Sequence, residues 1–109
     1  MSSKPVIRQA QAKRDIEEVV RHHAAEADER VVENVIAELE RASDHLAHHP
    51  ATGSLRYAYA LDLPDLRVWP LKRFPYLMFY VERDDHVEIW RVLHHTRDLE
   101  ASLRELGSR

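Results

Sequence analysis

The sequence predicts an α+β domain with an N-terminal edge strand, a helical hairpin packed on a small antiparallel sheet, and a short C-terminal helix. Three observations support this class. Residues 66–98 hold both tryptophans, both phenylalanines and two of the four tyrosines. Apolar positions within this stretch form runs that suit strands. Upstream of it, apolar positions recur at helical spacing.

Composition indicates a single domain over residues 1–109. A chain of 109 residues buries roughly 60–70% of its unfolded surface and needs no covalent staple. The absence of cysteine excludes disulfides and thiolate chemistry. No apolar run reaches the roughly 18 residues of a membrane span, and residues 1–9 lack the apolar core of a signal peptide. We therefore expect a cytoplasmic protein with no membrane partner.

A strand and a helix are predicted at the N-terminal end. Pro5–Arg8 begins with proline and holds two β-branched residues, which favours an edge strand. From about residue 11 to residue 27, one stripe recurs at i, i+3, i+4 and i+7, as on the buried face of a helix. The stripe consists of Ile16, Val19, Val20 and His23.

The second helix, residues 29–48, has the clearest pattern in the chain. Asp28 can cap its first turn, and Pro50 ends it. Its stripe consists of Val32, Val35, Ile36, Leu39, Ser43 and Leu46. The residues expected to pack against one face of the sheet are Ile16, Val19, Val20, Val32, Val35, Ile36 and Leu39, with Leu77, Phe79 or their neighbours opposite.

The strands follow in the second half of the chain. Pro75–Glu82 is apolar at nearly every position, which suits a central strand covered on both faces. The polar residues before Val87–His94 predict a hairpin loop of about three to five residues, because no glycine is present for a tighter turn. Leu66–Lys72 pairs on the other side and is the expected edge, since Pro70 lacks a backbone donor.

Two segments beside these strands are less regular. Leu55–Leu63 alternates weakly, and its pattern does not decide between a short strand and an ordered loop. After the sheet, Asp98 can cap a short helix over Leu99–Leu106, which Gly107 ends.

Basic residues gather in or beside the predicted sheet, although the formal net charge is −3. They are Arg67, Lys72, Arg73, Arg91 and Arg97. Guanidinium groups on an exposed surface can bind phosphate or an acidic protein, although Arg91 can instead pair with a sheet carboxylate such as Glu82 or Glu88. The acidic net charge argues against a protein that coats nucleic acid non-specifically. Among the aromatic residues, Trp69 or Trp90 is expected to be exposed, on whichever sheet face the helices leave bare.

The eight histidines raise the question of a metal site. Most stand in adjacent pairs, such as His22 and His23, and neighbours on a helix or strand point to different faces. His45 and His49 have helical i, i+4 spacing, but the sequence places no third ligand beside them. We therefore expect no metal site.

The predicted elements follow one another as a short strand, a helical hairpin and then antiparallel strands. The antiparallel strands include the segments LKRFPYLMFY and IWRVLHHTRD. This arrangement resembles the ParE branch of the RelE/ParE family of bacterial type II toxins. The likeness extends from Pro5 to about Leu103 and is most specific at Lys72–Tyr76 and Arg91–His94, followed by Arg97–Asp98. It implies a RelE/ParE-like toxin domain in a stress-response system.

The family also implies partners. A cognate, ParD-like antitoxin would neutralise the toxin in a hetero-oligomer. ParE-like members poison DNA gyrase, so gyrase is the expected target, with no catalytic residue, cofactor or small-molecule substrate. Gln9 and Ala10 stand where the family usually has a Ser-Pro helix cap, which predicts a weaker cap.

The expected target-binding surface consists of the predicted C-terminal helix and a set of basic residues. These are Arg67, Lys72, Arg73, Arg91, His94 and Arg97. The alternative is a RelE-like, ribosome-dependent messenger RNA endoribonuclease, with His94 or His95 as proton carrier beside Arg91. The lack of any tyrosine after Tyr80 and the acidic net charge disfavour it. A weaker alternative is a non-toxic homologue that only binds.

Overall fold

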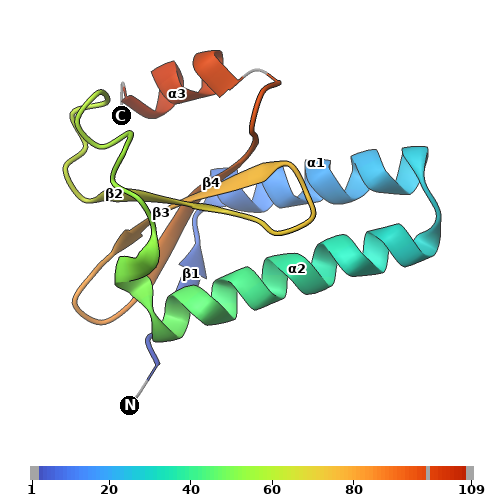
Figure 1. Cartoon of the computed structure of the whole chain (residues 1–109), viewed down its shortest axis with the longest axis horizontal. Coiled ribbons are helices and arrows are strands. Elements are labelled where there is room, and N and C mark those ends of the chain that lie inside the picture. Colours follow the sequence, from blue (N-terminus) through green and yellow to red (C-terminus); the bar gives the residue numbers. More distant parts are fainter. Residues whose placement is uncertain (1–2, 98, 108–109) are drawn as a thin grey trace.

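In the part of the chain that the structure describes, residues 3–97 and 99–107, a mixed four-stranded sheet lies between a helical hairpin and a layer formed by a loop and a short helix (Figure 1). The structure is a computed structural model. Its elements are β1 (Val6–Arg8), α1 (Ala10–Glu26), α2 (Glu29–His48), the 3-10 turn η1 (Pro50–Thr52), β2 (Leu66–Pro70), β3 (Tyr76–Glu82), β4 (Val87–His94) and α3 (Leu99–Gly107). The predicted fold class is confirmed.

The strand order is β1-β4-β3-β2. β3 pairs antiparallel with β2 and with β4, so its central position and the edge position of β2 are confirmed. β1 is the other edge strand, as predicted, but it pairs parallel with β4, with Val6 opposite Val87. A parallel pair needs a long connection, and here the chain that connects β1 to β4 includes both helices of the hairpin. The sheet is therefore mixed and not antiparallel throughout.

The ends of the predicted elements are set by local hydrogen bonds. Gln9 precedes α1 without a side-chain cap bond, in agreement with the weak cap expected there. The Asp28 carboxylate accepts a hydrogen bond from the Val31 backbone N at 3.2 Å and so caps α2. A loop of residues 83–86 joins β3 to β4, closed by a bond from Arg83 N to the His86 carbonyl at 2.8 Å. Asp98, the predicted cap of α3, lies outside the described residues.

The helical hairpin covers one face of the sheet. Val19, Val35 and Leu39 are buried there, and Ile16 packs against this core. Val20 and Val32 are half-buried. The expected burial of Ile36 is wrong, because 39% of this residue is exposed.

The rotation of α2 about its axis explains the error at Ile36. The helix turns Ala42 and Glu38 inward, both at most 4% exposed. The Glu38 carboxylate accepts hydrogen bonds from Arg41 Nη2 at 3.0 Å and from the Lys72 backbone N at 2.8 Å. An acidic residue on the inner face of the helix was not expected from the apolar stripe.

On the sheet, Leu77, Phe79 or their neighbours were expected to pack against the hairpin, and it is the neighbours that do so. Tyr76, Met78 and Tyr80 of β3 pack against the helices, whereas Leu77 and Phe79 face the opposite layer. The neighbours of the named residues thus fill the core beneath α1 and α2. Both faces of β3 are buried, as its unbroken apolar run predicted.

The second face of the sheet is covered by α3 and by the loop that precedes β2. Leu106 of α3 is buried against this face of the sheet, and Leu61 and Leu63 pack against the same cluster. Leu55–Leu63 forms successive turns and not a strand, which settles the alternative left open by its pattern. No helix in the described ranges combines the length and the apolar character needed to cross a membrane.

Candidate target-binding site

Arg91 is held in the interior, with 8% of the residue exposed. Its Nε donates to Asp15 Oδ2 at 2.8 Å, and its Nη2 donates to Asp15 Oδ1 at 3.2 Å. Burial acts to lower the pKa of the guanidinium, but the bonds to Asp15 outweigh it and the pKa of Arg91 is raised. The exposed position expected for Arg91 is therefore wrong. Its main partner is on α1 and not on the sheet, where Glu82 and Glu88 were considered.

A β-bulge in β4 produces this arrangement. Phe79 pairs with Arg91, but the next residue of β3, Tyr80, pairs with Ile89, so Trp90 is an extra residue in its strand. Val87, Ile89 and Val92 all belong to the core beneath the hairpin. The alternation of side chains between the two faces of the sheet therefore shifts by one residue between positions 89 and 92. As a result the Arg91 side chain and the Val92 backbone N both reach the same carboxylate, the latter at 2.9 Å from Asp15 Oδ2.

Four of the predicted site residues lie at one end of the sheet. Tyr76, the first residue of β3, pairs with His94, the last residue of β4. The His95 backbone N donates to the Pro75 carbonyl at 2.8 Å, which ties the loop after β4 to the loop before β3. We call this region the sheet end; its predicted site residues are Lys72, Arg73, His94 and Arg97.

Arg73 has an unusual backbone at this place. Its φ of 70° lies in the left-handed region, which a residue with a Cβ seldom adopts. The Leu71 backbone N donates to the Tyr76 carbonyl at 2.9 Å and closes the loop around it. The side chain of Arg73 is exposed as a result of this tight turn.

Arg67 does not join the sheet end. It pairs with Tyr80, near the opposite end of β2. Its Nη1 donates to the carbonyl of Ala51 at 3.1 Å and to that of Gly53 at 2.8 Å. Two backbone acceptors hold this guanidinium against the loop after α2.

The sheet end is built around a chain of aromatic rings from three segments. His23 of α1 lies between Phe74 and Tyr76, with ring centroids 5.7 and 6.0 Å away. His23 Nε2 and the Tyr76 hydroxyl are within hydrogen-bonding distance, at 3.2 Å. Tyr76 in turn contacts His94 at 5.6 Å, and His94 contacts His95 at 5.0 Å. The fold thus brings His22 and His23 of α1 close to His94 and His95 at the C-terminal end of β4 and just after it.

The pKa values at the sheet end reflect burial and neighbouring charge. Burial, then His22, then Arg97 lower the pKa of His23. Burial, followed by Arg97, His95 and His22, lowers the pKa of His94. Burial also raises the pKa of Tyr76 against the effect of Arg97. The two histidines are therefore predominantly neutral at pH 7, where imidazole would ordinarily be about a quarter protonated.

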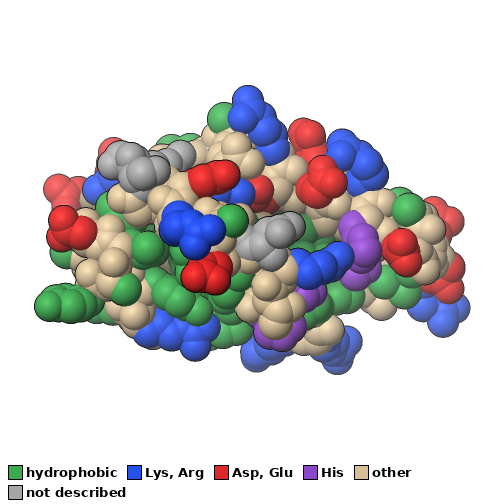
Figure 2. Space-filling model, turned by 90° about the horizontal axis from the view of Figure 1, so that it is seen from above, with side chains coloured by type: hydrophobic (Ala, Val, Ile, Leu, Met, Phe, Trp, Pro, Cys, Tyr) green, Lys and Arg blue, Asp and Glu red, His purple; other side chains and the backbone are tan. Residues whose placement is uncertain are grey.

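His94 has a defined tautomer when neutral. The backbone N atoms of Thr96 and Arg97 both donate to His94 Nδ1 at 3.1 Å. The Nδ1 atom is therefore an acceptor, and the ring proton is on Nε2. A shallow cleft of about 330 Å³ opens beside this ring, lined by His22, His94, Arg97 and Ser102 among others. Figure 2 shows histidine side chains beside basic ones on this side of the molecule, to the right of centre.

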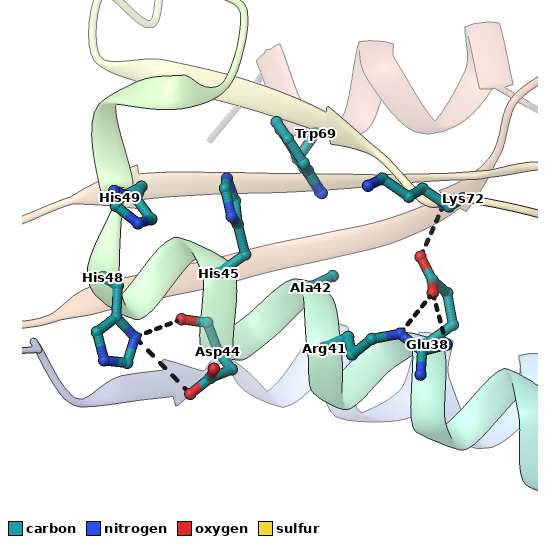
Figure 3. A pocket seen from close by; sticks show the side chains of 9 residues that line it. All are labelled: Glu38, Arg41, Ala42, Asp44, His45, His48, His49, Trp69 and Lys72. Atoms are coloured by element: carbon teal, nitrogen blue, oxygen red, sulfur yellow. Dashed lines mark hydrogen bonds and ion pairs between the residues drawn. The ribbon is translucent and has the colours of Figure 1, made fainter.

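A second cleft, of about 470 Å³, lies between α2 and β2 (Figure 3). The His45 ring stacks on Trp69, with centroids 4.5 Å apart and planes at 22°. In Figure 3, Lys72 extends along the same wall of the cleft, and Arg41 lines the cleft from α2. Sequence reasoning missed this cleft, because nothing in the local pattern places α2 beside β2.

The tryptophans are both partly buried. Trp69 packs on the hairpin face and Trp90 on the α3 face, so neither lies on a sheet face left bare. Within residues 3–97 and 99–107, no three histidine or acidic side chains come together in a way that would hold a metal ion. The rings of His45 and His49 lie side by side, with centroids 5.2 Å apart.

Known proteins resemble this chain in sequence and in fold. The model of the family described as "ParE toxin of type II toxin-antitoxin system, parDE" matches residues 6–99. A chain in the solved structure "Chromosomal ParDE TA system from P. aeruginosa" superposes with a TM-score of 0.70, covers 84% of this chain and 96% of its own length, and is 13% identical. That identity supports a likeness of fold only. No curated protein sequence matches this chain.

Proposed function

Because this chain belongs to the ParE toxin family of type II toxin–antitoxin systems, we propose that it stops growth by binding DNA gyrase and catalyses no reaction of its own. Inhibition of this kind requires only that the bound toxin disfavours one conformation of the topoisomerase cycle. The contact surface that we assign is the sheet end, with Lys72, Arg73, His94 and Arg97.

The observation that carries this assignment is the charge balance around the sheet end. Asp15 is paired with Arg91 at 2.8 Å, and Glu18 is paired with Arg21 at 2.8 Å. Within the described residues, no carboxylate forms an ion pair with Lys72, Arg73 or Arg97. A local excess of positive charge in an acidic protein favours an anionic target such as a gyrase–DNA complex.

The nuclease alternative receives less support from the same geometry. Arg91, which it needs beside the scissile phosphate, is 8% exposed and bonded to Asp15. His94 Nδ1 already accepts two backbone hydrogen bonds and is not available to take a proton from a 2′-hydroxyl. His95 is exposed and is the remaining candidate for a proton carrier.

The test is a comparison of gyrase and translation with purified protein. We expect inhibition of supercoiling, or accumulation of cleaved DNA, in the gyrase assay. Arg97→Glu should abolish this effect, whereas Arg56→Glu, a charge-matched control in the exposed loop before β2, should retain it. If gyrase is unaffected and codon-positioned cuts appear in ribosome-bound messenger RNA, the nuclease alternative replaces the proposal. A protein inactive in both assays would favour the non-toxic homologue.

We further propose a cognate antitoxin that covers apolar surface of this domain. Support comes from side chains left uncovered in the free chain, such as Tyr59 at 97% and Ile7 at 51% exposure. Because contact of this type is largely apolar, both proteins should copurify through a high-salt wash that weakens ionic contacts. The toxin-binding segment of the antitoxin should be disordered alone and fold on binding. Separate monomers by light scattering at micromolar concentrations would contradict the pairing.

A further inference from the structure

β1 (Val6–Arg8; blue in Figure 1) leaves one of its two edges open. The strand has a single neighbour, because it stands first in the order β1-β4-β3-β2. On the side of that neighbour, Val87 N donates to the Pro5 carbonyl and Gln9 N donates to the Ile89 carbonyl, both at 2.9 Å. In the described part of the chain, no strand pairs with the other side of β1.

The backbone groups on this open edge belong to Val6 and Arg8. Along a strand in a parallel pair, residues that bond to the neighbour alternate with residues whose N–H and C=O point away from it. Since Pro5 and Gln9 bond to β4, Ile7 does so too, and Val6 and Arg8 point outward. Among the described residues, no backbone hydrogen bond within the chain uses these outward groups. An extended peptide can therefore bond to them as a further strand.

A shallow groove of about 400 Å³ lies beside the open edge and is lined by Val6, Ile7, Arg8 and Lys13. Side chains alternate between the two faces of a strand, so Arg8 lies on the same face as Val6, which packs against the core beneath the hairpin. Ile7 lies on the other face and is 51% exposed. The edge thus presents cations on the hairpin face and an apolar side chain on the opposite face.

The cations of this groove are not neutralised within the described part of the chain. Neither Arg8 nor Lys13 forms an ion pair there. The carboxylate of Glu88 in β4 stands opposite Ile7 on the other face, where its Oε2 lies 2.9 Å from His86 Nε2. A segment that adds to β1 therefore meets uncompensated positive charge on the hairpin face.

We propose that the open edge of β1 binds an extended segment of a separate protein, in which acidic and apolar residues alternate. The backbone of this segment pairs with Val6 and Arg8. Its carboxylates meet Arg8 and Lys13 on the hairpin face, and its apolar side chains cover Ile7 on the other face. A second copy of this chain is a poorer occupant, because pairing β1 with β1 brings the cations of both copies to one interface.

The inference goes beyond the proposed function and concerns a different part of the sheet. β1 pairs with residues 87–89, at the start of β4, whereas the sheet end lies at the end of β4. A segment bound to β1 therefore leaves the proposed target-binding surface open.

The experiment titrates the full chain into a fluorescent synthetic peptide of about eight residues, in which glutamate and valine alternate, at low salt. We expect saturable binding with a Kd on the order of 10–100 μM, since the edge is only three residues long. A peptide of the same composition with its glutamates and valines in two separate blocks is the matched control. It should bind at least about fivefold more weakly, because alternation places each residue type on one face.

Amide hydrogen exchange of the full chain, followed by nuclear magnetic resonance, tests the mode of binding. With peptide at about ten times its Kd, exchange at the amides of Val6 and Arg8 should slow by about tenfold. The amide of Ile7, which faces β4, should change little. Ionic attachment to the same cations leaves the outward amides unprotected, so this measurement separates it from strand addition.

Variants separate the charges from the backbone. Arg8→Gln with Lys13→Gln should weaken binding by about threefold to tenfold, whereas Arg14→Gln, at the next exposed position of α1 and outside the groove, should bind as the wild type does. Arg8→Pro removes an N–H that β4 does not use and should bind more weakly than Arg8→Gln. Methylation of the peptide amides that face β1 tests the same bonds with the protein unchanged, and should abolish binding.

Four results would overturn the inference: no saturable binding up to about 1 mM peptide, equal binding of the block or methylated peptide, equal binding by the variant without Arg8 and Lys13, or unchanged exchange at Val6 and Arg8. Dimers of the free chain in light scattering, with these two amides already protected, would also overturn it and would assign the edge to self-pairing. Gyrase inhibition is measured in a separate assay, so failure of the proposed function leaves this inference standing, and the reverse also holds.

Discussion

Removal of the Asp15 carboxylate is expected to destabilise the protein strongly, because this group holds α1 to β4. Asp15 accepts bonds from Arg91 Nε, Arg91 Nη2 and Val92 N at 2.8, 3.2 and 2.9 Å. The side chains of both charged residues are only 10% exposed. Asp15→Ala therefore leaves a buried guanidinium without its main counter-charge, which typically costs about 3–5 kcal/mol.

A second acceptor sets the expected value within this range. Glu105 lies 3.5 Å from Arg91 Nη1, and its side chain is 75% exposed and able to adjust. We therefore expect a loss of about 3 kcal/mol, at the lower end of the range. The double variant Asp15→Leu with Arg91→Met should be at least about 1 kcal/mol more stable than Asp15→Ala, because it removes both charges together.

The assay is urea unfolding followed by far-ultraviolet circular dichroism. Glu18→Ala is the control on the same helix, because Glu18 and its partner Arg21 have side chains that are 75% and 68% exposed. Exposed pairs contribute little, so this variant should lose less than about 0.5 kcal/mol. If Asp15→Ala loses no more than this control, the ion pair does not anchor β4 to α1 and the reasoning is refuted.

Three further predictions concern the core and the pH dependence of stability. Leu39→Ala, at 2% exposure, should cost about 2–5 kcal/mol in urea unfolding, whereas Ile36→Ala, at 39% exposure, should cost less than about 1 kcal/mol. Tyr80→Phe removes a buried hydroxyl that donates to a carbonyl of η1 at 2.7 Å, and should lose about 1–3 kcal/mol; an unchanged midpoint would contradict this. A hydrogen bond from His86 is the main cause that lowers the pKa of Glu88 from 4.5 to about 2. The stabilisation from Glu88 is thus present above about pH 4.5 and lost as the pH falls toward 2, so Glu88→Gln should flatten the acid limb of the stability curve.

Local patterns predicted the elements of this fold well. The stripe through Val35 and Leu39 identified α2, and the unbroken apolar run of β3 identified a strand covered on both faces. The length of the loop between β3 and β4 followed from the absence of glycine there. In each of these cases the information lies within a few neighbouring residues, which is the range over which periodicity acts.

The parts that were wrong depend on contacts between distant segments. Arg91 looks like a surface cation in its own strand, and its partner Asp15 stands 76 positions away. The bulge at Trp90 changes which residues of β4 face α1, and the residue types in VEIWRVLH do not reveal it. In the same way, only the packed structure shows that Glu38 is bonded to Lys72 across the cleft. The arrangement of the candidate site residues therefore could not be predicted from the sequence, and their role in target binding stays a prediction.

The parallel pairing of β1 with β4 bears on how the protein folds during synthesis. β1 is made before the other strands of the sheet, yet the Val87 N that donates to the Pro5 carbonyl at 2.9 Å belongs to the last strand, β4. Closing so large a loop is slow, whereas a hairpin such as β3–β4 forms in about 1–10 μs. The β3–β4 hairpin should therefore form first and β1 should dock last. A growing chain thus cannot complete its sheet until β4 has emerged from the ribosome.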